Sequence, residues 1–283
     1  MENLAYSGAM TLKTNKELAF LHELFVATDW GERFAELIDK HVKLPKEGRA
    51  LYVASGTGGH VIALQERANK NLTFLGVDES KENLVLAREK AKTALKEEFE
   101  FRVETIDRLR FADNQFNLVI GDGSLIHSER IPEMILELVR VAAPKAVVAL
   151  VLPSFSSFGE FFSIYWEALH NLGLMDHEPD VETLITVLPS ASHLEELAEQ
   201  AGLENVATTT QIEEFDYESA DAFLAAPLVA DFLMPIWLEI LPPDSHQPVI
   251  DEIGRIVNQE TQGVAFVLTL KATLLTGEKS LAH

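Results

Sequence analysis

Arg-Ala-Leu-Tyr-Val-Ala-Ser-Gly-Thr-Gly-Gly-His, residues 49–60, is the stretch that decides the fold. Leu51 and Val53 suit a buried strand, residues 54–59 are all small, and from Val61 apolar residues recur at helical spacing. A strand that turns sharply into a helix through small residues lets a ligand approach the backbone near the partly positive helix N-terminus. The stretch therefore predicts a site for either a nucleotide phosphate or S-adenosylmethionine.

A second strand is expected over residues 72–77, and it ends at Asp78. An acid at the end of the second strand of an α/β nucleotide-binding fold binds a ribose, because a carboxylate accepts hydrogen bonds from both hydroxyls. Ser80 then caps a helix that has Glu79 at its start. Asp78 could instead be only a helix-capping acid, but the glycine-rich turn one strand upstream favours the ribose role.

Strand and helix patterns alternate through the first half of the chain, which implies right-handed crossovers and a parallel sheet. Ligands of such sheets bind at the carboxyl ends of the strands. We expect strands near residues 50–54, 73–77, 100–104, 116–120 and 146–152, and helices near residues 59–68, 81–96 and 129–141. Residues 14–41 predict two further helices that precede the first strand.

Five stretches resemble the motifs of class I S-adenosylmethionine-dependent methyltransferases. LYVASGTGG and FLGVDESKENLVLAREKA resemble the first two motifs, and LRFADNQFNLVIGDGSLIH, LELVRVAAPKAVVALVLP and HLEELAEQAGLENV resemble later ones. The matches are collinear over about residues 48–210, and a closing strand is expected near 264–274. The resemblance implies an α/β fold with a Rossmann-like, seven-stranded, mostly parallel sheet flanked by helices. It also implies S-adenosyl-L-methionine as cofactor and S-adenosyl-L-homocysteine as product.

The resemblance further implies which residues bind the cofactor: Tyr52, Ala54, Ser55, Gly56, Thr57, Gly58, Asp78, Glu79, Thr105, Ile106 and Gly121. Three of these positions depart from the family pattern, and the mildest departure is Ala54 in place of the first glycine of the motif. Tyr52 stands where the family usually has an acid that faces the amino end of the cofactor, and Thr105 stands where an acid near the adenine is usual. Tyr52 leaves the ammonium without its usual counter-charge, which Asp122 could partly supply.

Methyl transfer from a sulfonium needs mainly alignment in a desolvated site, and a base is required only if the nucleophile must lose a proton. His127 is the first candidate for that base, because it follows the fourth strand where the family's loop faces the methyl group. It could instead only shape the pocket, and Asp122 is the second catalytic candidate. The histidines have no metal-ligand spacing, so we expect no metal.

The expected organisation has two additions to a minimal fold. Phe158, Phe162 and Tyr165 recur on one helical face directly after the fifth strand, and they predict either an aromatic wall for the methyl acceptor or a helix docked onto the core. Pro235 and the pair at 242–243 predict short helices in the second addition. We expect an N-terminal helical segment (1–47), a cofactor-binding core (48–152), an aromatic-rich insertion (153–190) and the rest of the core (191–283) with a helical cap at about 216–262.

Charge and composition limit the partners. The 283 residues include 45 acids and 23 bases, a net charge of −22, and contain no cysteine. Nucleic-acid binding needs Lys and Arg to neutralise phosphates, so we expect neither nucleic acid nor an anionic membrane as partner. The missing cysteine excludes disulfides, thiolate metal sites and a catalytic thiol. The start of the chain has no leader pattern, which predicts a cytoplasmic protein.

The resemblance and the charge together predict a methyltransferase that acts on a small neutral or apolar acceptor. Tyr52 keeps open a methyltransferase-like binding protein that has lost catalysis. An NAD-dependent oxidoreductase is the more distant alternative, because residues 54–59 fit a relaxed G-x-G-x-x-G. The sequence does not name the acceptor, the atom methylated or the oligomeric state.

Overall fold

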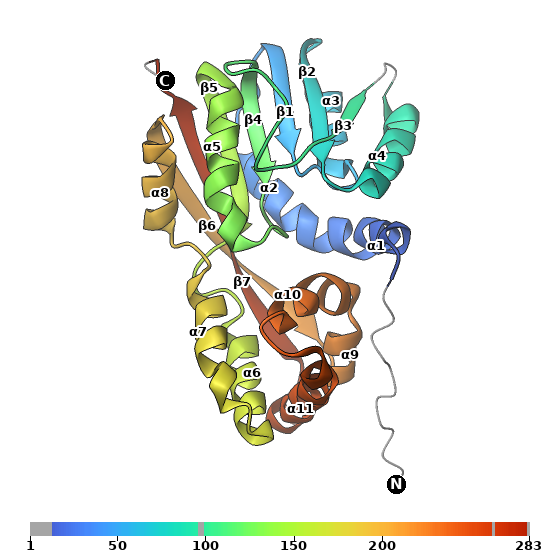
Figure 1. Cartoon of the computed structure of the whole chain (residues 1–283). Coiled ribbons are helices and arrows are strands. Elements are labelled where there is room, and N and C mark those ends of the chain that lie inside the picture. The colour runs from blue at the N-terminus through green and yellow to red at the C-terminus, as the bar shows by residue number, and fades with distance from the viewer. Residues whose placement is uncertain (1–12, 96–98, 262–263, 282–283) are drawn as a thin grey trace.

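A seven-stranded mixed sheet forms the centre of the computed structural model, which describes residues 13–95, 99–261 and 264–281. Its strand order is β3-β2-β1-β4-β5-β7-β6, in which β7 runs antiparallel to both of its neighbours and the other pairs are parallel. This confirms the predicted fold class (Figure 1). The strands are β1 (Glu47–Val53), β2 (Asn71–Asp78), β3 (Glu100–Val103), β4 (Phe116–Asp122), β5 (Ala142–Pro153), β6 (Leu203–Tyr217) and β7 (Phe266–Lys279).

The parallel half of the sheet brings the ends of its central strands together. Val53 at the end of β1 is level with Val77 on β2 and with Gly121 on β4. The residues of β1 from Ala50 to Val53 are buried, as expected for a strand covered on both faces. The helices that connect and cover these strands are α3 (Gly59–Arg67), α4 (Lys81–Ala94), η2 (Ser128–Arg130) and α5 (Ile131–Val141). The loops that follow β1, β2 and β4 therefore meet at one edge of the sheet.

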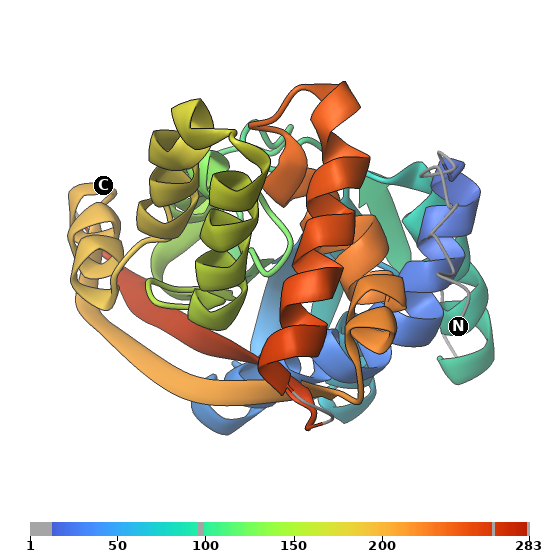
Figure 2. The ribbon, with the colours of Figure 1, turned by 90° about the horizontal axis from the view of Figure 1, so that it is seen from below.

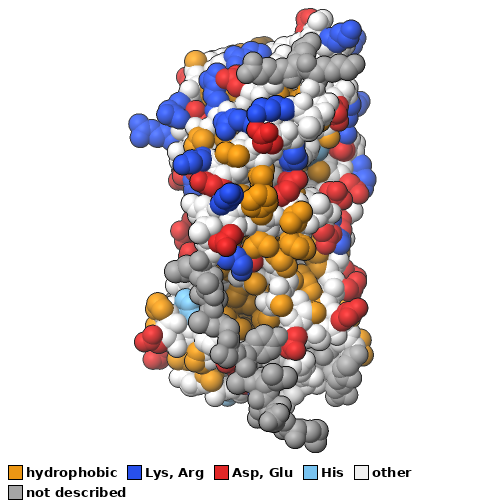
Figure 3. Space-filling view, turned by 90° about the vertical axis from the view of Figure 1, so that its right-hand side faces the viewer, with side chains coloured by type: hydrophobic (Ala, Val, Ile, Leu, Met, Phe, Trp, Pro, Cys, Tyr) orange, Lys and Arg blue, Asp and Glu red, His pale blue; other side chains and the backbone are white. Residues whose placement is uncertain are grey.

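The N-terminal helices run across that edge (Figure 1). They are α1 (Asn15–Leu21), the π-helix η1 (His22–Gly31) and α2 (Glu32–His41), where the sequence predicted two helices. A capping box between Thr14 and Glu17 starts α1. The helices bury Val26 and Trp30 but leave Leu24 60% exposed. Apolar side chains also gather in the middle of the molecular face on that side, below a region where acidic and basic side chains intermix (Figure 3).

Helices within residues 159–186 and 220–261 lie below the sheet edge and form a second layer, which we call the cap (Figure 1). Seen from below, α6 (Gly159–Leu172) and α7 (Glu178–Thr186) lie on one side of the cap and α11 (Pro243–Thr261) lies on the other (Figure 2). Strands β6 and β7 are 15 and 14 residues long and continue from the core into the cap (Figure 1). The remaining helices are η3 (Met175–His177), α8 (Ala191–Gln200), α9 (Ala220–Ala225), η4 (Leu228–Leu233) and α10 (Met234–Leu238).

One expectation about the cap was wrong. The proline pair at 242–243 does not lead to another short helix, because Pro243 is the first residue of the 19-residue helix α11. Proline is well tolerated in the first turn of a helix, where its missing N–H would have no partner anyway. Pro248 also lies inside α11 without ending it.

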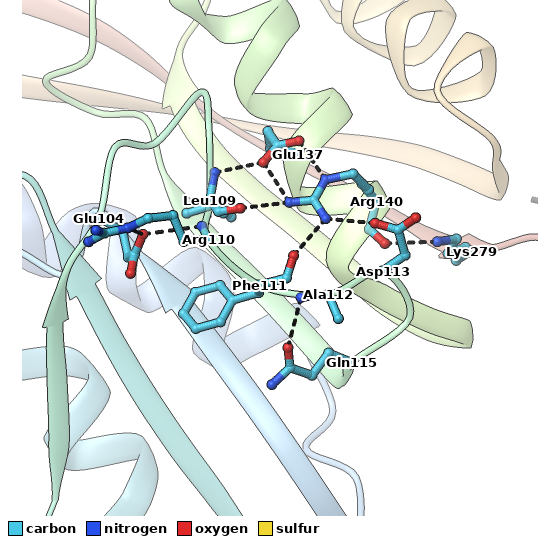
Figure 4. A network of polar contacts seen from close by, with 10 residues as sticks. All are labelled: Glu104, Leu109, Arg110, Phe111, Ala112, Asp113, Gln115, Glu137, Arg140 and Lys279. Atoms are coloured by element: carbon cyan, nitrogen blue, oxygen red, sulfur yellow. Dashed lines mark hydrogen bonds and ion pairs between the residues drawn. The ribbon is translucent and has the colours of Figure 1, made fainter.

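Arg140 on α5 holds the long loop between β3 and β4 against the core (Figure 4). Its guanidinium donates to the carbonyl oxygens of Leu109 and Phe111, both at 2.8 Å, and pairs with Glu137 and Asp113. Hydrogen bonds to a charged donor are among the stronger ones in proteins. The same loop carries Ile106 toward the site described next, so this network fixes one wall of that site.

Candidate cofactor and acceptor sites

A cavity of about 530 Å³, here called cavity 1, opens at the carboxyl ends of β1, β2 and β4. The N-terminal helices close it on the side away from the sheet. Of the predicted cofactor-binding residues, eight line it: Tyr52, Ala54, Ser55, Gly56, Thr57, Asp78, Glu79 and Ile106. Asp122, the second catalytic candidate, lines it as well.

The glycine-rich turn after β1 takes a left-handed backbone at three places, Ala54 (φ 57°), Gly56 (φ 54°) and Gly58 (φ 80°). Ser55 N–H donates to Val77 O at 2.9 Å, which ties the turn to β2. A Cβ on Gly56 would lie 2.8 Å from Cε1 of His22, so a larger residue there would have to displace the His22 ring of η1. The close approach of η1 to this turn makes the N-terminal helices part of the cavity wall.

Asp78 is buried, with 8% of its surface exposed, and its carboxylate already accepts three hydrogen bonds. The donors are Gly56 N–H at 2.8 Å, Ser80 N–H at 2.9 Å and Asn83 Nδ2 at 3.3 Å. Burial raises the pKa of Asp78, and these donors work against that rise. A carboxylate has about four acceptor positions, so Asp78 keeps one for a ligand hydroxyl.

Glu79 and Asp107 flank Arg130, which holds the loops after β2 and β3 together. Arg130 donates two hydrogen bonds to Glu79, at 2.6 and 3.0 Å, and one to Asp107 at 3.1 Å. Glu79 also accepts the N–H of Ile106 at 3.2 Å. The hydrogen bonds from Arg130 lower the pKa of Glu79. Because the charge of Glu79 is compensated in this way, the residue is suited to shaping the cavity.

Four buried side-chain atoms have no hydrogen-bond partner among the described residues, and all four belong to residues on the wall of cavity 1. They are His22 Nδ1, Trp30 Nε1, Ser55 Oγ and Thr57 Oγ1. Buried polar atoms are nearly always paired in proteins. Such a cluster beside one cavity fits a polar ligand such as S-adenosylmethionine. Burial lowers the pKa of His22 to about 4, so its ring is neutral near pH 7.

Tyr52 and Asp122 lie on neighbouring strands at the same side of cavity 1. Tyr52 is 3% exposed, and its hydroxyl lies 3.0 Å from Nδ1 of His60. Asp122 accepts the N–H of Ser124 at 2.9 Å, and burial raises its pKa. Burial and then the charge of Asp122 raise the pKa of Tyr52, which keeps the phenol protonated.

Three predicted cofactor residues do not appear among those that line cavity 1: Gly58, Thr105 and Gly121. A Cβ on Gly58 would lie 2.8 Å from Ala87 Cβ, and one on Gly121 would lie 2.8 Å from side-chain atoms of both Met134 and Leu138. The side-chain positions of both glycines therefore face packed core. Thr105 is exposed and bridges Arg108, while its neighbour Ile106 points into the wall.

A second cavity of about 260 Å³, cavity 2, lies between the loop after β4 and the cap. It shares Ser124, Leu125 and Ile126 with cavity 1, so the two cavities adjoin along this loop. His127, the first candidate base, lies on its wall. The apolar residues on this wall are Leu125, Ile126, Pro153, Phe158, Phe162, Leu184, Val187, Leu188, Leu233, Ile236, Trp237 and Ile240.

The predicted aromatic wall is divided between cavity and core. Phe158 and Phe162 line cavity 2, although both are almost fully buried. Tyr165 does not appear on the wall; it is 0% exposed, and its hydroxyl donates to Trp237 O at 3.0 Å. Trp237 itself lines cavity 2. Tyr165 therefore supports the wall from behind.

The resemblance implied that the N-terminal segment packs over the cofactor end of the sheet, with Tyr6 or Met10 across the cofactor, but both of these residues lie outside the described part of the chain. Sequence reasoning named no residue of η1 or η4 at cavity 1. His22 and Trp30 come from η1, and Phe232 comes from η4. His22 packs edge-on against Phe232, with ring centroids 5.9 Å apart. Amphipathic spacing in this segment predicted burial, but no local pattern distinguishes a residue buried in a core from one beside a ligand cavity.

Comparisons with known proteins place the chain in a family. A family model described as a methyltransferase domain matches residues 44–202, more than half of the chain. The comparison with curated proteins found no match to this chain. The YcgJ protein of Bacillus subtilis is similar in structure, with a TM-score of 0.58, 18% identity, and 88% of this chain and 99% of that chain covered.

Two further solved structures are similar at low identity, which establishes the fold alone. Phosphoethanolamine N-methyltransferase 2 of Haemonchus contortus, in complex with S-adenosyl-L-methionine, has a TM-score of 0.54 and 14% identity, with 94% of this chain and 57% of that chain covered. The cyclase SpnF has a TM-score of 0.50 and 18% identity, with 88% of this chain and 80% of that chain covered. By its family-model match, the chain belongs to the methyltransferase-domain family and is an S-adenosylmethionine-dependent methyltransferase.

Proposed function

We propose that the chain transfers a methyl group from S-adenosylmethionine in cavity 1 to a small, largely apolar and uncharged acceptor in cavity 2. The observation that carries this proposal is the wall shared by the two cavities, formed by Ser124, Leu125 and Ile126. A methyl donor on one side of this loop can face an acceptor on the other. Bringing donor and acceptor into line supplies most of the catalysis that methyl transfer needs.

On the cofactor side, Asp78 binds the ribose through its remaining acceptor position, and the turn 54–57 packs against the cofactor through its backbone. The unpartnered atoms of Ser55 and Thr57 are available to the polar end of the cofactor. Ile106, 1% exposed and on the cavity wall, suits the flat apolar surface of the adenine. Each of these residues then contacts a part of the cofactor that matches its own polarity.

On the acceptor side, no Lys or Arg occurs among the described residues that line cavity 2, and most of its wall is hydrocarbon or aromatic. An anionic acceptor would lose hydration there without gaining a counter-charge. His127 is exposed at the rim and serves as the base when the acceptor has a proton to lose. We assign residues 153–190 and 216–262 to the cap that encloses the acceptor, with the core at 48–152 and N-terminal helices before it.

The acceptor site is tested by filling it. Leu184→Trp adds bulk to the wall of cavity 2, and Leu136→Trp places the same change on an exposed leucine of α5. With labelled S-adenosylmethionine and a panel of small phenols, amines and carboxylic acids, we expect wild type and Leu136→Trp to methylate apolar neutral compounds. Leu184→Trp is expected to lose this turnover but to bind S-adenosylhomocysteine normally. Equal turnover by both variants, or preference for the anionic compounds, would contradict the proposal.

A nucleic-acid acceptor is disfavoured by the charge of −22. On the face shown in Figure 3, Lys and Arg side chains are interspersed with Asp and Glu. Within the described part of the chain, no helix combines the length and apolarity needed to cross a membrane. Salt-sensitive binding to RNA or DNA at physiological ionic strength would overturn the small-molecule assignment.

A further inference from the structure

A chain of polar side chains leads from the molecular surface to the wall of cavity 1. Arg67 on α3 pairs with Asp39 on α2, and Asp39 Oδ1 lies 2.9 Å from Nε2 of His60. The other ring nitrogen of His60, Nδ1, lies 3.0 Å from the hydroxyl oxygen of Tyr52. Tyr52 and His60 both line cavity 1. Contacts between α2, α3 and β1 therefore form one chain that ends at the Tyr52 hydroxyl oxygen.

The hydrogen-bond directions in this chain follow from Asp39. Burial opposes its ionisation, but the hydrogen bonds from His60 and Arg67 outweigh burial and hold the pKa of Asp39 well below its usual range. An ionised carboxylate can only accept, so His60 Nε2 donates to it. When the His60 ring is neutral, Nδ1 is then the acceptor and the Tyr52 O–H donates to it. In that arrangement the lone pairs of the Tyr52 oxygen are available to a donor in the cavity.

Asp122 supplies a second acceptor beside Tyr52. Five acids line cavity 1, and they differ in how far they are compensated or solvated. Glu23 pairs with Lys90 at 2.6 Å, Glu79 pairs with Arg130, Asp78 accepts three N–H groups, and Glu32 is exposed to solvent. Lys90 is the one Lys or Arg among the described residues that line this cavity, and Glu23 holds it. Asp122 accepts from Ser124 and retains acceptor capacity.

S-Adenosylmethionine offers two cationic groups to this corner. Its ammonium can donate three hydrogen bonds, whereas its sulfonium has no proton to donate. A phenol oxygen with free lone pairs beside a partly buried carboxylate suits a hydrogen-bond donor. We propose that Tyr52 and Asp122 together bind the α-ammonium of the cofactor, in place of the acid that the first motif lacks. His60 and Asp39 act as positioning residues that fix the Tyr52 hydroxyl.

This inference rests on cavity 1 being the cofactor site, and its test separates the two claims. The probes are S-adenosylhomocysteine and its deaminated analogue, in which hydrogen replaces the amino group. Both lack the sulfonium, so the ratio of their dissociation constants reports on the ammonium alone. Calorimetry on wild type is expected to show that the amino group strengthens binding by about tenfold or more.

Tyr52→Phe removes one oxygen and keeps the ring, and Asp122→Asn removes one charge and keeps the shape. We expect each to reduce the ratio at least about threefold while the deaminated analogue binds as it does to wild type, which also shows that the variant is folded. Asp39→Asn should reduce the ratio by a smaller factor, because it acts only through His60. Tyr217→Phe, the same change at a tyrosine that does not line cavity 1, should leave the ratio unchanged.

Each other outcome has a definite meaning. If wild type binds neither probe, cavity 1 is not the cofactor site. If wild type binds both probes and the ratio is the same in Tyr52→Phe and Asp122→Asn, the ammonium assignment alone is wrong. If Asp122→Asn weakens S-adenosylmethionine but not S-adenosylhomocysteine, Asp122 acts on the sulfonium and the proposal fails. An unchanged ratio in Asp39→Asn overturns the positioning role of the residues behind Tyr52.

Discussion

Replacing Asp78 by alanine tests both the cofactor site and the structure of the turn beside it. The carboxylate joins the end of β2 to the glycine-rich turn through Gly56 N–H and to the start of α4 through Ser80 N–H. Alanine leaves these donors without their acceptor. Because removal of the buried charge also relieves its desolvation, we expect the free energy of unfolding to fall by only about 1–3 kcal/mol.

The same substitution should also weaken binding of the ligand. A charge-assisted hydrogen bond to a ribose hydroxyl contributes about 1.5–3 kcal/mol, so affinity for S-adenosylhomocysteine should fall about ten- to a hundredfold. Calorimetry measures this change, and thermal melting measures the stability loss, at about 2–4 °C for each kcal/mol in a chain of this size.

Glu214→Ala is the matched control, because Glu214 is exposed on β6 and does not line cavity 1. It removes the same charge and should leave the dissociation constant within about twofold of wild type, as expected for a screened charge outside the site. A folded Asp78→Ala variant that binds S-adenosylhomocysteine as tightly as wild type would refute the reasoning. A wild-type protein without measurable affinity would refute the site.

Three further predictions concern stability. Burial lowers the pKa of His22 to about 4, whereas the pKa in the unfolded chain is about 6.5. The stability that comes from keeping His22 neutral in the fold is therefore fully present above pH 6.5. As the pH drops from 6.5 to 4, the free energy of unfolding should fall by up to about 3 kcal/mol. His22→Phe should flatten this part of a urea-unfolding series, and an equal pH slope in both proteins would contradict the assignment. Tyr165→Phe leaves the buried carbonyl of Trp237 without its donor and should cost about 1–2 kcal/mol while cofactor affinity stays unchanged; a loss of affinity would place Tyr165 at the site instead. Gly58→Ala should lower the free energy of unfolding by about 2–4 kcal/mol, because φ at this position is left-handed, at 80°, and the added Cβ would lie 2.8 Å from the Ala87 Cβ. Gly59→Ala is the control: the added Cβ would have only Lys90 Nζ nearby, at 3.7 Å, and thermal melting should show almost no change.

The residues at the sheet edge of cavity 1 could be anticipated from sequence because they are placed by local rules. A buried strand ending in small residues puts Ser55, Gly56 and Thr57 at the carboxyl edge of a parallel sheet, whatever else the chain does. The end of the next strand puts Asp78 beside them, and the structure adds that Asp78 holds the turn directly. Gly58 shows the limit of this reasoning: the motif gives its place in the turn, but not that its side-chain position faces the packed core and not cavity 1.

The lining of cavity 2 depends on helix rotation and on contacts between distant segments. Phe162 and Tyr165 are three residues apart on α6, yet one lines cavity 2 and the other donates to Trp237, 72 positions away. Helical spacing identifies a shared face but not what that face meets. The position of α10, and with it Trp237, is set by packing in the cap, which leaves no periodic pattern in the sequence.

Sequence by itself determined the alternation of strands and helices, the glycine-rich turn and the acid at Asp78, since each depends on neighbours a few residues away. Only the tertiary structure brought His22 from η1 onto Gly56, and Asp39 and His60 behind Tyr52. These contacts join residues from separate elements, and their geometry is fixed by how whole helices pack on the sheet. The departure at Tyr52 was visible in the sequence, but the polar chain behind it became visible only once α2 and α3 were in place.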